Sequence, residues 1–193
     1  MPETNNQNRR KGTTPIDNTY GHLQPQAPDF ERVVLGALMV DKDAFTVISE
    51  IIRPETFYEP RHQKIYRAIQ NMNMQELPVD FMTVVEQLRK EGTLEDVGGP
   101  AYIVELSQQV ASSAHIEYHS RVLAQKFLAR QLISYASFIE TKAFDETIDI
   151  DDLMQEAEGS LFELSQKNMK KDYTQIDPVI KNAVDVIQKA AQN

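Results

Sequence analysis

The chain has 193 residues, of which 41% are hydrophobic, enough for one core with appendages. It contains no cysteine, which excludes disulfides and thiolate metal sites. Its formal net charge of -9 argues against direct nucleic-acid binding, because contacts to a phosphate backbone depend on clustered Lys and Arg.

Residues 1–28 are rich in Asn, Gln, Pro and Thr and have almost no apolar content. Such a segment cannot bury enough surface to offset the entropy lost on ordering, so we predict a disordered tail. No apolar run follows its basic residues, so we expect no signal peptide. The longest apolar runs, such as Val33 to Val40, are far shorter than the roughly 18 to 20 residues of a membrane span. We therefore expect a soluble, cytoplasmic protein with no membrane contact.

Residues 29–112 are predicted to form a compact, globular helical domain. Apolar side chains recur there at i, i+3, i+4 and i+7, the spacing of helices with one buried face. Asp29 and Asp43 each precede such a stripe and are plausible N-caps of two short helices. No period-2 alternation of useful length occurs anywhere in the chain, so we predict an all-α fold.

Two more helices are predicted in the same domain. Pro60 suits the first turn of a helix, and Asp80 suits the N-cap of the next, which Gly92 ends. His62, in the first of these helices, fits a half-buried packing residue better than a catalytic base.

Gly98, Gly99 and Pro100 stand directly in front of the fifth predicted helix. Glycines before a helix N-terminus can hold a phosphate group. No Lys, Ser or Thr follows closely, however, and the Walker and dinucleotide-binding glycine patterns are both absent. We interpret the stretch as a turn, and we expect no catalytic or cofactor-binding residue in this chain.

Residues 113–166 predict a long helix followed by a helical hairpin. About 30 residues up to Ala143 contain neither Gly nor Pro, which at about 1.5 Å per residue makes a helix of roughly 45 Å. After a break at residues 145–149, a second apolar stripe predicts a helix that returns along the first. The long helix extends past this partner, so we expect self-association.

This region also contains an acidic segment and a pair of histidines that are candidate binding sites. Residues 140–163 hold nine acids against one base, typical of a solvated helix face, or alternatively of a surface that selects a basic partner. The aspartates of the break lack the glycine of a calcium loop, so we assign them to the turn and an N-cap. His115 and His119 have a zinc-compatible i, i+4 spacing but no evident third ligand. No metal site is predicted.

The C-terminal residues form two predicted segments. Residues 167–176 are a polar linker, and residues 177–193 predict one more helix. Its apolar side consists of Ile180, Ala183, Val184 and Ile187. Nothing else in the chain covers that side, so either it docks on another molecule or the sequence has been cut from a longer protein.

Five stretches carry a family resemblance when taken in order. They are "ERVVLGALMVDKDAF", "FYEPRHQKIYRAIQNM", "PVDFMTVVEQLRKEGTLEDVGGPAYIVEL", "HIEYHSRVLAQKFLARQLI" and "AEGSLFEL". Together they resemble the N-terminal domain of the bacterial DnaB-type replicative DNA helicase. The resemblance covers about Phe30 to Leu164, and the last predicted helix resembles the linker helix of that family.

The resemblance implies a six-helix globular domain followed by a hairpin through which N-terminal domains pair. It further implies a hexameric ring built as a trimer of dimers, a linker helix packed on a neighbouring subunit, and recruitment of a DnaG-type primase. A helicase loader is a further candidate partner. The motor domain with its Walker motifs is absent from these 193 residues. ATP and magnesium are therefore expected only in that domain, and this chain is not expected to be an enzyme.

The resemblance also implies interface residues. Those expected for self-association and primase contact are Leu132, Ile133, Ala136, Ile139, Leu153, Met154 and Leu161. Those expected for docking of the linker helix are Ile180, Ala183, Val184 and Ile187. The alternative function is a stand-alone helical adaptor or a motorless regulator of the helicase ring. A stop codon after Asn193 would favour this alternative, and an open frame into a Walker motif would favour the helicase.

Overall fold

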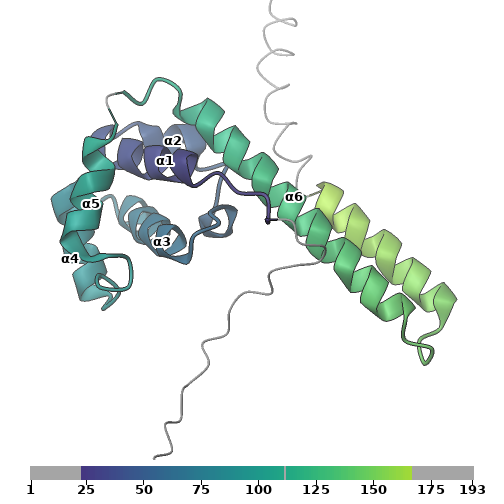
Figure 1. Ribbon diagram of the computed structural model, residues 1–193. Coiled ribbons are helices and arrows are strands. Elements are labelled where there is room, and N and C mark those ends of the chain that lie inside the picture. The colour runs from purple at the N-terminus through teal and green to yellow at the C-terminus, as the bar shows by residue number, and fades with distance from the viewer. Residues whose placement is uncertain (1–22, 111, 167–193) are drawn as a thin grey trace, which may run out of the picture.

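The computed structural model describes residues 23–110 and 112–166, and every regular element in those ranges is a helix. The elements, in chain order, are α1 (Pro28–Val40), α2 (Ala44–Ile48), the 3-10 helix η1 (Pro54–Thr56), α3 (Pro60–Met74), α4 (Phe81–Lys90), α5 (Gly99–Gln108), α6 (Ile116–Ala143) and a final helix over residues 150–166, called the return helix below (Figure 1). The predicted all-α class is confirmed. Each of these helices is too short or too polar to cross a membrane.

Helix α1 lies at the centre of the globular part and packs against α3, α5 and α6. Its buried face carries Val34, Leu35 and Leu38, each at most 2% exposed. Around it lie large side chains from the rest of the globular part; those with no exposure include Ile48, Phe57, Ile65, Tyr66, Ile69, Leu88, Ile103 and Leu106. One apolar core therefore joins α1 to α5, as helical spacing predicted.

Gly36 lets α1 and α5 approach closely. A Cβ atom at this position would collide with the carbonyl oxygen of Leu106 and lie 2.6 Å from a methyl carbon of Val110. We expect Gly36→Ala to lower the free energy of unfolding by about 1–3 kcal/mol through overpacking, measured by urea denaturation. Gly159 is the control, because a Cβ atom there meets nothing within 4 Å, so Gly159→Ala should not destabilise. Equal stability of the two variants would refute the close approach.

The helix ends show which local predictions hold. The Asp80 side chain accepts hydrogen bonds from the backbone N–H groups of Met82 and Thr83, so the predicted N-cap is confirmed. Gly92 follows α4 with a φ of 72°, and Gly98 precedes α5 with a φ of 106°. Both residues therefore adopt the left-handed conformation that favours glycine and lets the chain turn at the helix end. The prediction for Asp29 is wrong. Helix α1 begins at Pro28 after Ala27, because proline suits the first helical position, and Asp29 lies inside the first turn.

The predicted boundary of the N-terminal tail, residue 28, lies too far along the chain. The described chain begins at residue 23, and the carbonyl oxygen of Pro25 accepts a 2.8 Å hydrogen bond from Nη1 of Arg130. The backbone immediately before α1 is thus held against α6. The rest of the predicted tail, residues 1–22, lies outside the described residues.

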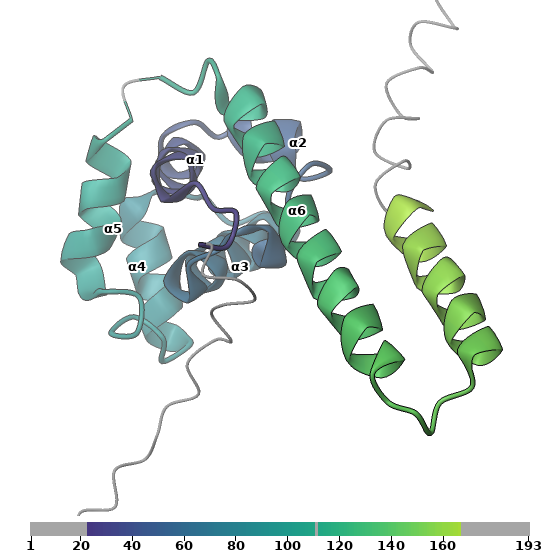
Figure 2. The same cartoon turned by 45° about the vertical axis from the view of Figure 1, so that its right-hand side comes forward.

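Helix α6 leaves the globular part, and the return helix runs back beside it in the antiparallel direction (Figure 2). The hydroxyl of Tyr135 donates a 2.9 Å hydrogen bond to the carbonyl oxygen of Ala157, and Nζ of Lys142 lies 2.6 Å from a carboxylate oxygen of Glu156. The predicted hairpin is therefore confirmed. The predicted linker and last helix, residues 167–193, lie outside the described residues.

Candidate functional site

The hairpin exposes large apolar side chains on both of its helices. Leu132 of α6 is 43% exposed, and Met154 and Leu161 of the return helix are 56% and 46% exposed. Ile150 is also exposed. Contiguous apolar surface of this kind marks an interaction site more often than isolated exposed residues do.

Helical spacing places them on one side of the hairpin. Tyr135 of α6 faces the return helix, since its hydroxyl bonds to Ala157. At about 100° per residue, Leu132 and Ala136 lie about 60–100° further around α6 from Tyr135. Leu153 of the return helix is buried toward α6, and Met154 lies about 100° beyond it in the same sense of rotation.

Because the two helices are antiparallel, the same sense of rotation leads to the same side of the pair. Leu132, Ala136, Ile150, Met154 and Leu161 therefore share one surface, whereas Phe138 and Phe162, which are also exposed, lie on other sides of their helices. We call this surface the hairpin apolar face, formed by Leu132, Ala136, Ile139, Ile150, Met154 and Leu161.

Two of the predicted interface residues lie elsewhere. Leu153 is 4% exposed within a single chain, so it packs between the two hairpin helices and is not available to a partner. The prediction that Leu153 belongs to the interface is therefore wrong, and its role is to pack the two hairpin helices together. Ile133 is half-buried and lies about 100° around α6 from Leu132, on the side away from the return helix. The docking residues predicted in the last helix, Ile180, Ala183, Val184 and Ile187, are outside the described residues.

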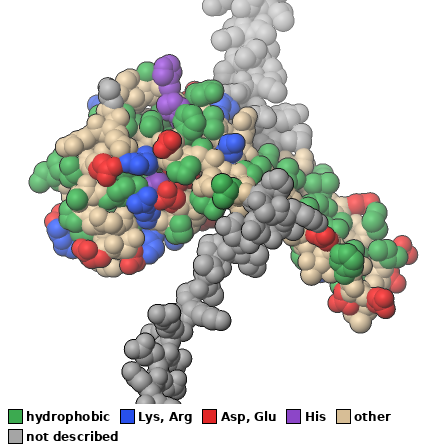
Figure 3. All heavy atoms as spheres, in the orientation of Figure 1, with side chains coloured by type: hydrophobic (Ala, Val, Ile, Leu, Met, Phe, Trp, Pro, Cys, Tyr) green, Lys and Arg blue, Asp and Glu red, His purple; other side chains and the backbone are tan. Residues whose placement is uncertain are grey.

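The far end of the hairpin is acidic (Figure 3). In the turn, the hydroxyl and backbone N–H of Thr147 both donate to Oδ1 of Asp145, which lowers the pKa of that carboxyl group. Oδ1 of Asp149 accepts from the backbone N–H groups of Asp151 and Asp152 at the start of the return helix. The predicted turn and N-cap roles are confirmed. In the described part of the chain, no three His, Asp or Glu side chains are grouped as metal ligands.

Arg130 fixes the hairpin to the globular part. Its Nη1 donates to the carbonyl oxygen of Pro25 at 2.8 Å and its Nη2 donates to that of Thr56 at 2.7 Å. The guanidinium carbon also lies 5.5 Å from the ring centroid of Phe127. Burial lowers the pKa of Arg130. Together with the packing of α6 against α1, α2 and η1, this side chain helps to set the direction in which the hairpin apolar face points.

A buried polar network joins three helices of the globular part. His62 has no exposure; its Nδ1 lies 2.6 Å from Oε2 of Glu31 and its Nε2 lies 2.6 Å from the hydroxyl of Tyr102. The carboxylate of Glu31 also accepts hydrogen bonds from the backbone N–H groups of Tyr58 and Glu59, just before α3. Burial raises the pKa of Tyr102. The prediction of a half-buried His62 is wrong, because these partners complete its burial.

The histidines of the i, i+4 pair lie beside each other at the start of α6. His119 is half-buried, and its ring centroid lies 5.0 Å from that of Phe30 and 6.4 Å from that of His115. Burial, with a smaller contribution from His115, lowers the pKa of His119. These contacts show that His119 packs against Phe30, while His115 is exposed beside it.

Comparisons with known proteins point to one family. The family model described as the DnaB-like helicase N terminal domain matches residues 23–125. The replicative DNA helicase DnaB of Rhodothermus marinus is 38% identical over 168 residues, which are 87% of this chain and 18% of that relative. The replicative DNA helicase DnaC of Bacillus subtilis (strain 168) is 33% identical, over 86% of this chain and 37% of that relative. The chain thus spans well under half the length of these relatives.

Two solved structures are also similar. The crystal structure of the N-terminal domain of DnaB helicase from Mycobacterium tuberculosis has a TM-score of 0.70 at 29% identity and covers 73% of this chain and 99% of that chain. A structure described as that of a DnaB-like replicative helicase and its interactions with primase has a TM-score of 0.60 at 27% identity, over 73% of this chain and 31% of that chain.

Proposed function

The chain belongs to the family of DnaB-like helicase N-terminal domains, and from this premise we propose that it assembles the subunits of a hexameric replicative DNA helicase and recruits a DnaG-type primase. The observation that carries this proposal is the hairpin apolar face, which one chain leaves uncovered. The face lies on a hairpin whose first helix is held against the globular part by its packing on α1, α2 and η1 and by the hydrogen bonds of Arg130. It is therefore presented to a partner without rearrangement of the fold.

Pairing of two hairpins would bury this face on both copies. Full burial of a Leu or Met side chain is worth about 1.5–3 kcal/mol relative to exposure. In a two-fold pair each residue counts twice, so Leu132, Met154 and Leu161 alone supply several kcal/mol. The -9 charge of each copy opposes pairing, so the association should strengthen as salt screens the repulsion.

The helicase reaction belongs, in this proposal, to a motor domain outside these 193 residues. ATP and magnesium would bind there, and DNA unwinding would take place there. The contribution of this chain is to hold subunits in register, with residues 177–193 docking on a neighbouring subunit through Ile180, Ala183, Val184 and Ile187. We place this work in the cytoplasm, at the replication fork, and a helicase loader is a further candidate partner.

Recruitment of primase is supported by the similar structure of a helicase described with its interactions with primase. A substitution at Ile133 can test primase binding without changing the hairpin apolar face, because Ile133 lies on the side of α6 away from the return helix. We expect Ile133→Asp to weaken binding of the C-terminal domain of a DnaG-type primase at least about 10-fold, or about 1.4 kcal/mol. Titration calorimetry with the primase of the same organism measures the change.

Gly159→Glu is the matched control for that titration, because it adds a charge to the return helix where there is open space. It should bind primase as the unmodified chain does. If neither the unmodified chain nor the control binds, primase recruitment is ruled out. Unchanged binding by Ile133→Asp would show that primase contacts a different side of the hairpin.

A further inference from the structure

A groove of about 570 Å³ lies between the two hairpin helices, on the side opposite to the hairpin apolar face. Its lining includes Gln24, Phe127, Gln131, Ser134, Ser160 and Leu164. Gln131 and Ser134 lie about 40° and 100° around α6 from Tyr135, in the sense of rotation opposite to that of Leu132. We call this surface the hairpin groove. It stays accessible when the hairpin apolar face is covered.

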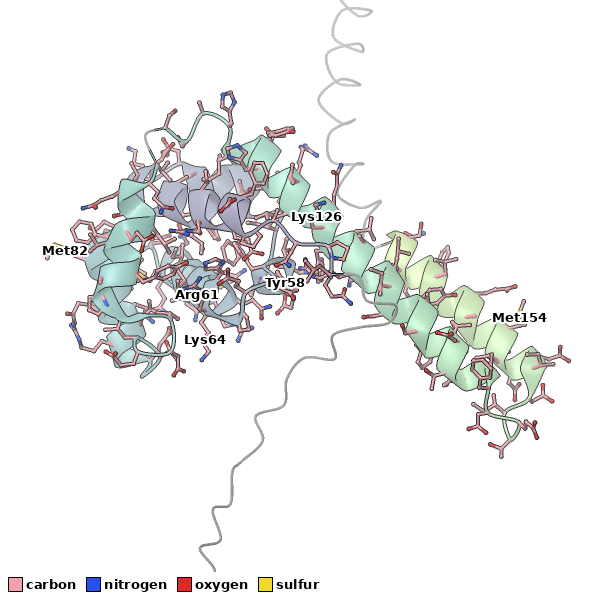
Figure 4. The ribbon with its side chains drawn as sticks, viewed as in Figure 1. Tyr58, Arg61, Lys64, Met82, Lys126 and Met154 are labelled. Atoms are coloured by element: carbon pink, nitrogen blue, oxygen red, sulfur yellow. The ribbon has the colours of Figure 1, made fainter. Side chains whose placement is uncertain are left out.

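The hairpin groove runs from the globular part toward the tip of the hairpin. At its globular end the guanidinium carbon of Arg130, which also lines the groove, lies 5.6 Å from the ring centroid of Tyr58, labelled beside α6 in Figure 4. From Phe127 to Ser134 the lining follows α6 for about 10 Å. Met154, also labelled in Figure 4, lies further along the return helix, toward the tip.

The lining offers polar groups that have no partner among the described residues. The side-chain amide of Gln131 and the hydroxyls of Ser134 and Ser160 form no hydrogen bond with another described residue. An extended polypeptide presents a backbone N–H and C=O at nearly every residue, and amide and hydroxyl side chains can bond to both. The groove therefore suits an extended, mostly polar segment of polypeptide.

This chain itself supplies such a segment at the rim of the groove. Gln24 lines the groove, and Arg130 holds the carbonyl oxygen of Pro25. The preceding residues, 1–22, which lie outside the described residues, therefore start at the groove. They are rich in Asn, Thr and Pro. Because the segment is tethered at the rim, its local concentration there is about millimolar, so a weak contact is enough to hold it.

Acidic side chains continue the same side of the hairpin toward its tip. Asp152, Glu156 and Glu163 are exposed and lie about 60–100° around the return helix from Leu153, on the side of the hairpin groove. Glu156 already pairs with Lys142 of α6. We call Asp152, Glu156 and Glu163 the acidic stripe. A segment that leaves the groove toward the tip meets this stripe.

The segment before Leu23 carries the matching charge. Residues 1–22 contain three bases and two acids, whereas residues 140–163 contain nine acids and one base. The three bases, called the basic cluster below, are Arg9, Arg10 and Lys11. The stretch from the basic cluster to Leu23 can extend about 40 Å, and the hairpin beyond Arg130 is only about 20 Å long. The basic cluster can therefore reach every residue of the acidic stripe.

We propose that residues 1–22 bind along the hairpin of their own chain. The stretch just before Leu23 occupies the hairpin groove, and the basic cluster contacts the acidic stripe. The segment thereby reduces the negative charge of the hairpin. It also covers a surface that suits a basic partner, so such a partner has to displace it. The contact leaves the hairpin apolar face open and is independent of the proposed function.

Limited digestion of the full 193-residue chain with trypsin, followed by mass spectrometry, tests the proposal. Trypsin cleaves after Arg and Lys, so the rate of cleavage at the basic cluster reports how often that cluster is unbound. The test variant removes the acidic stripe by Asp152→Asn, Glu156→Gln and Glu163→Gln. Cleavage in the unmodified chain should be at least about 5-fold slower than in this variant, because three surface ion pairs act together. The rate should not change on dilution.

The matched control removes three other acids of the hairpin, by Glu146→Gln, Asp151→Asn and Glu158→Gln. Asp151 and Glu158 lie about 140–160° around the return helix from Leu153, away from the groove, and Glu146 lies in the turn. This control changes the net charge by the same amount and should be cleaved as slowly as the unmodified chain. Circular dichroism should show equal helicity in all variants, since every substituted acid is exposed.

Ser134→Tyr tests the hairpin groove itself, because it fills the groove without changing the charge. It should also speed cleavage at the basic cluster, and an unchanged rate would overturn the occupation of the groove. Equal rates in the unmodified chain and the variant without the acidic stripe would overturn the contact as a whole, as would an equal increase in the matched control. A rate that rises on dilution would show that the segment comes from another copy, which contradicts a contact within one chain.

Discussion

Replacing Glu31 with alanine is expected to lower the free energy of unfolding by about 3–5 kcal/mol, because three groups lose their hydrogen-bond acceptor at about 1–3 kcal/mol each. Glu31 is 1% exposed, and His62, which it contacts, has no exposure. Without the carboxylate, the imidazole and the backbone N–H groups of Tyr58 and Glu59 lose their acceptor inside the protein. Domains of this size are typically stable by about 5–15 kcal/mol, so the loss is a large share.

Denaturant unfolding at neutral pH, followed by circular dichroism, measures this effect. Tyr102→Phe provides the graded comparison, because it removes only the hydroxyl that contacts Nε2 of His62. That variant should lose about 1–3 kcal/mol, the cost of one buried group left without its partner. If Glu31→Ala is no less stable than Tyr102→Phe, the carboxylate does not hold the three helices together.

Met154→Glu is expected to weaken pairing of the chain by at least about 30-fold, since loss of a central interface residue typically costs about 2 kcal/mol or more. The new carboxylate would lie in the middle of the hairpin apolar face, on both copies at once. Met154 is 56% exposed within one chain, so the substitution should leave helicity and stability unchanged. Light scattering coupled to size-exclusion chromatography, with circular dichroism on the same samples, separates loss of pairing from loss of fold.

Gly159→Glu is the matched control for this variant. It adds the same charge to the same helix, about 140° around the axis from Met154, at a position where a side chain meets nothing within 4 Å. Glutamate also forms helix more readily than glycine, so the fold should be retained. Equal weakening by the two substitutions would indicate that added charge alone, rather than the hairpin apolar face, controls association.

Helices and their ends were largely predictable because they depend on local rules. The spacing of apolar residues indicated the helices, and Asp80, Gly92 and Gly98 fill their expected places at helix ends. Asp29 was misplaced for an equally local reason. Pro28 also fits a first helical position, and the structure uses it in that way.

The assignment of Leu153 shows what spacing cannot decide. Leu153 and Met154 belong to the same apolar stripe, but about 100° of rotation puts one between the hairpin helices and the other on the surface. A stripe reveals that a helix has an apolar side. The neighbouring helix determines which part of that side is already covered.

The buried network was missed because its partners are distant in sequence, with His62 lying 31 residues from Glu31 and 40 from Tyr102. One signal was nevertheless present. Glu31 falls on the same helix face as Val34, Leu35 and Leu38, and a carboxylate on an apolar stripe needs a buried partner. Which residue supplied that partner depended on the packing of α3 and α5 against α1.

Sedimentation equilibrium of the unmodified chain, Met154→Glu and Gly159→Glu, at equal concentrations and at two salt concentrations, tests the central claim most directly. The claim is that the hairpin apolar face joins copies of this domain. We expect the unmodified chain and Gly159→Glu to associate alike, and more tightly at higher salt, while Met154→Glu is at least about 30-fold weaker. An unmodified chain that remains monomeric, or a Met154→Glu chain that associates as tightly as Gly159→Glu does, would contradict it.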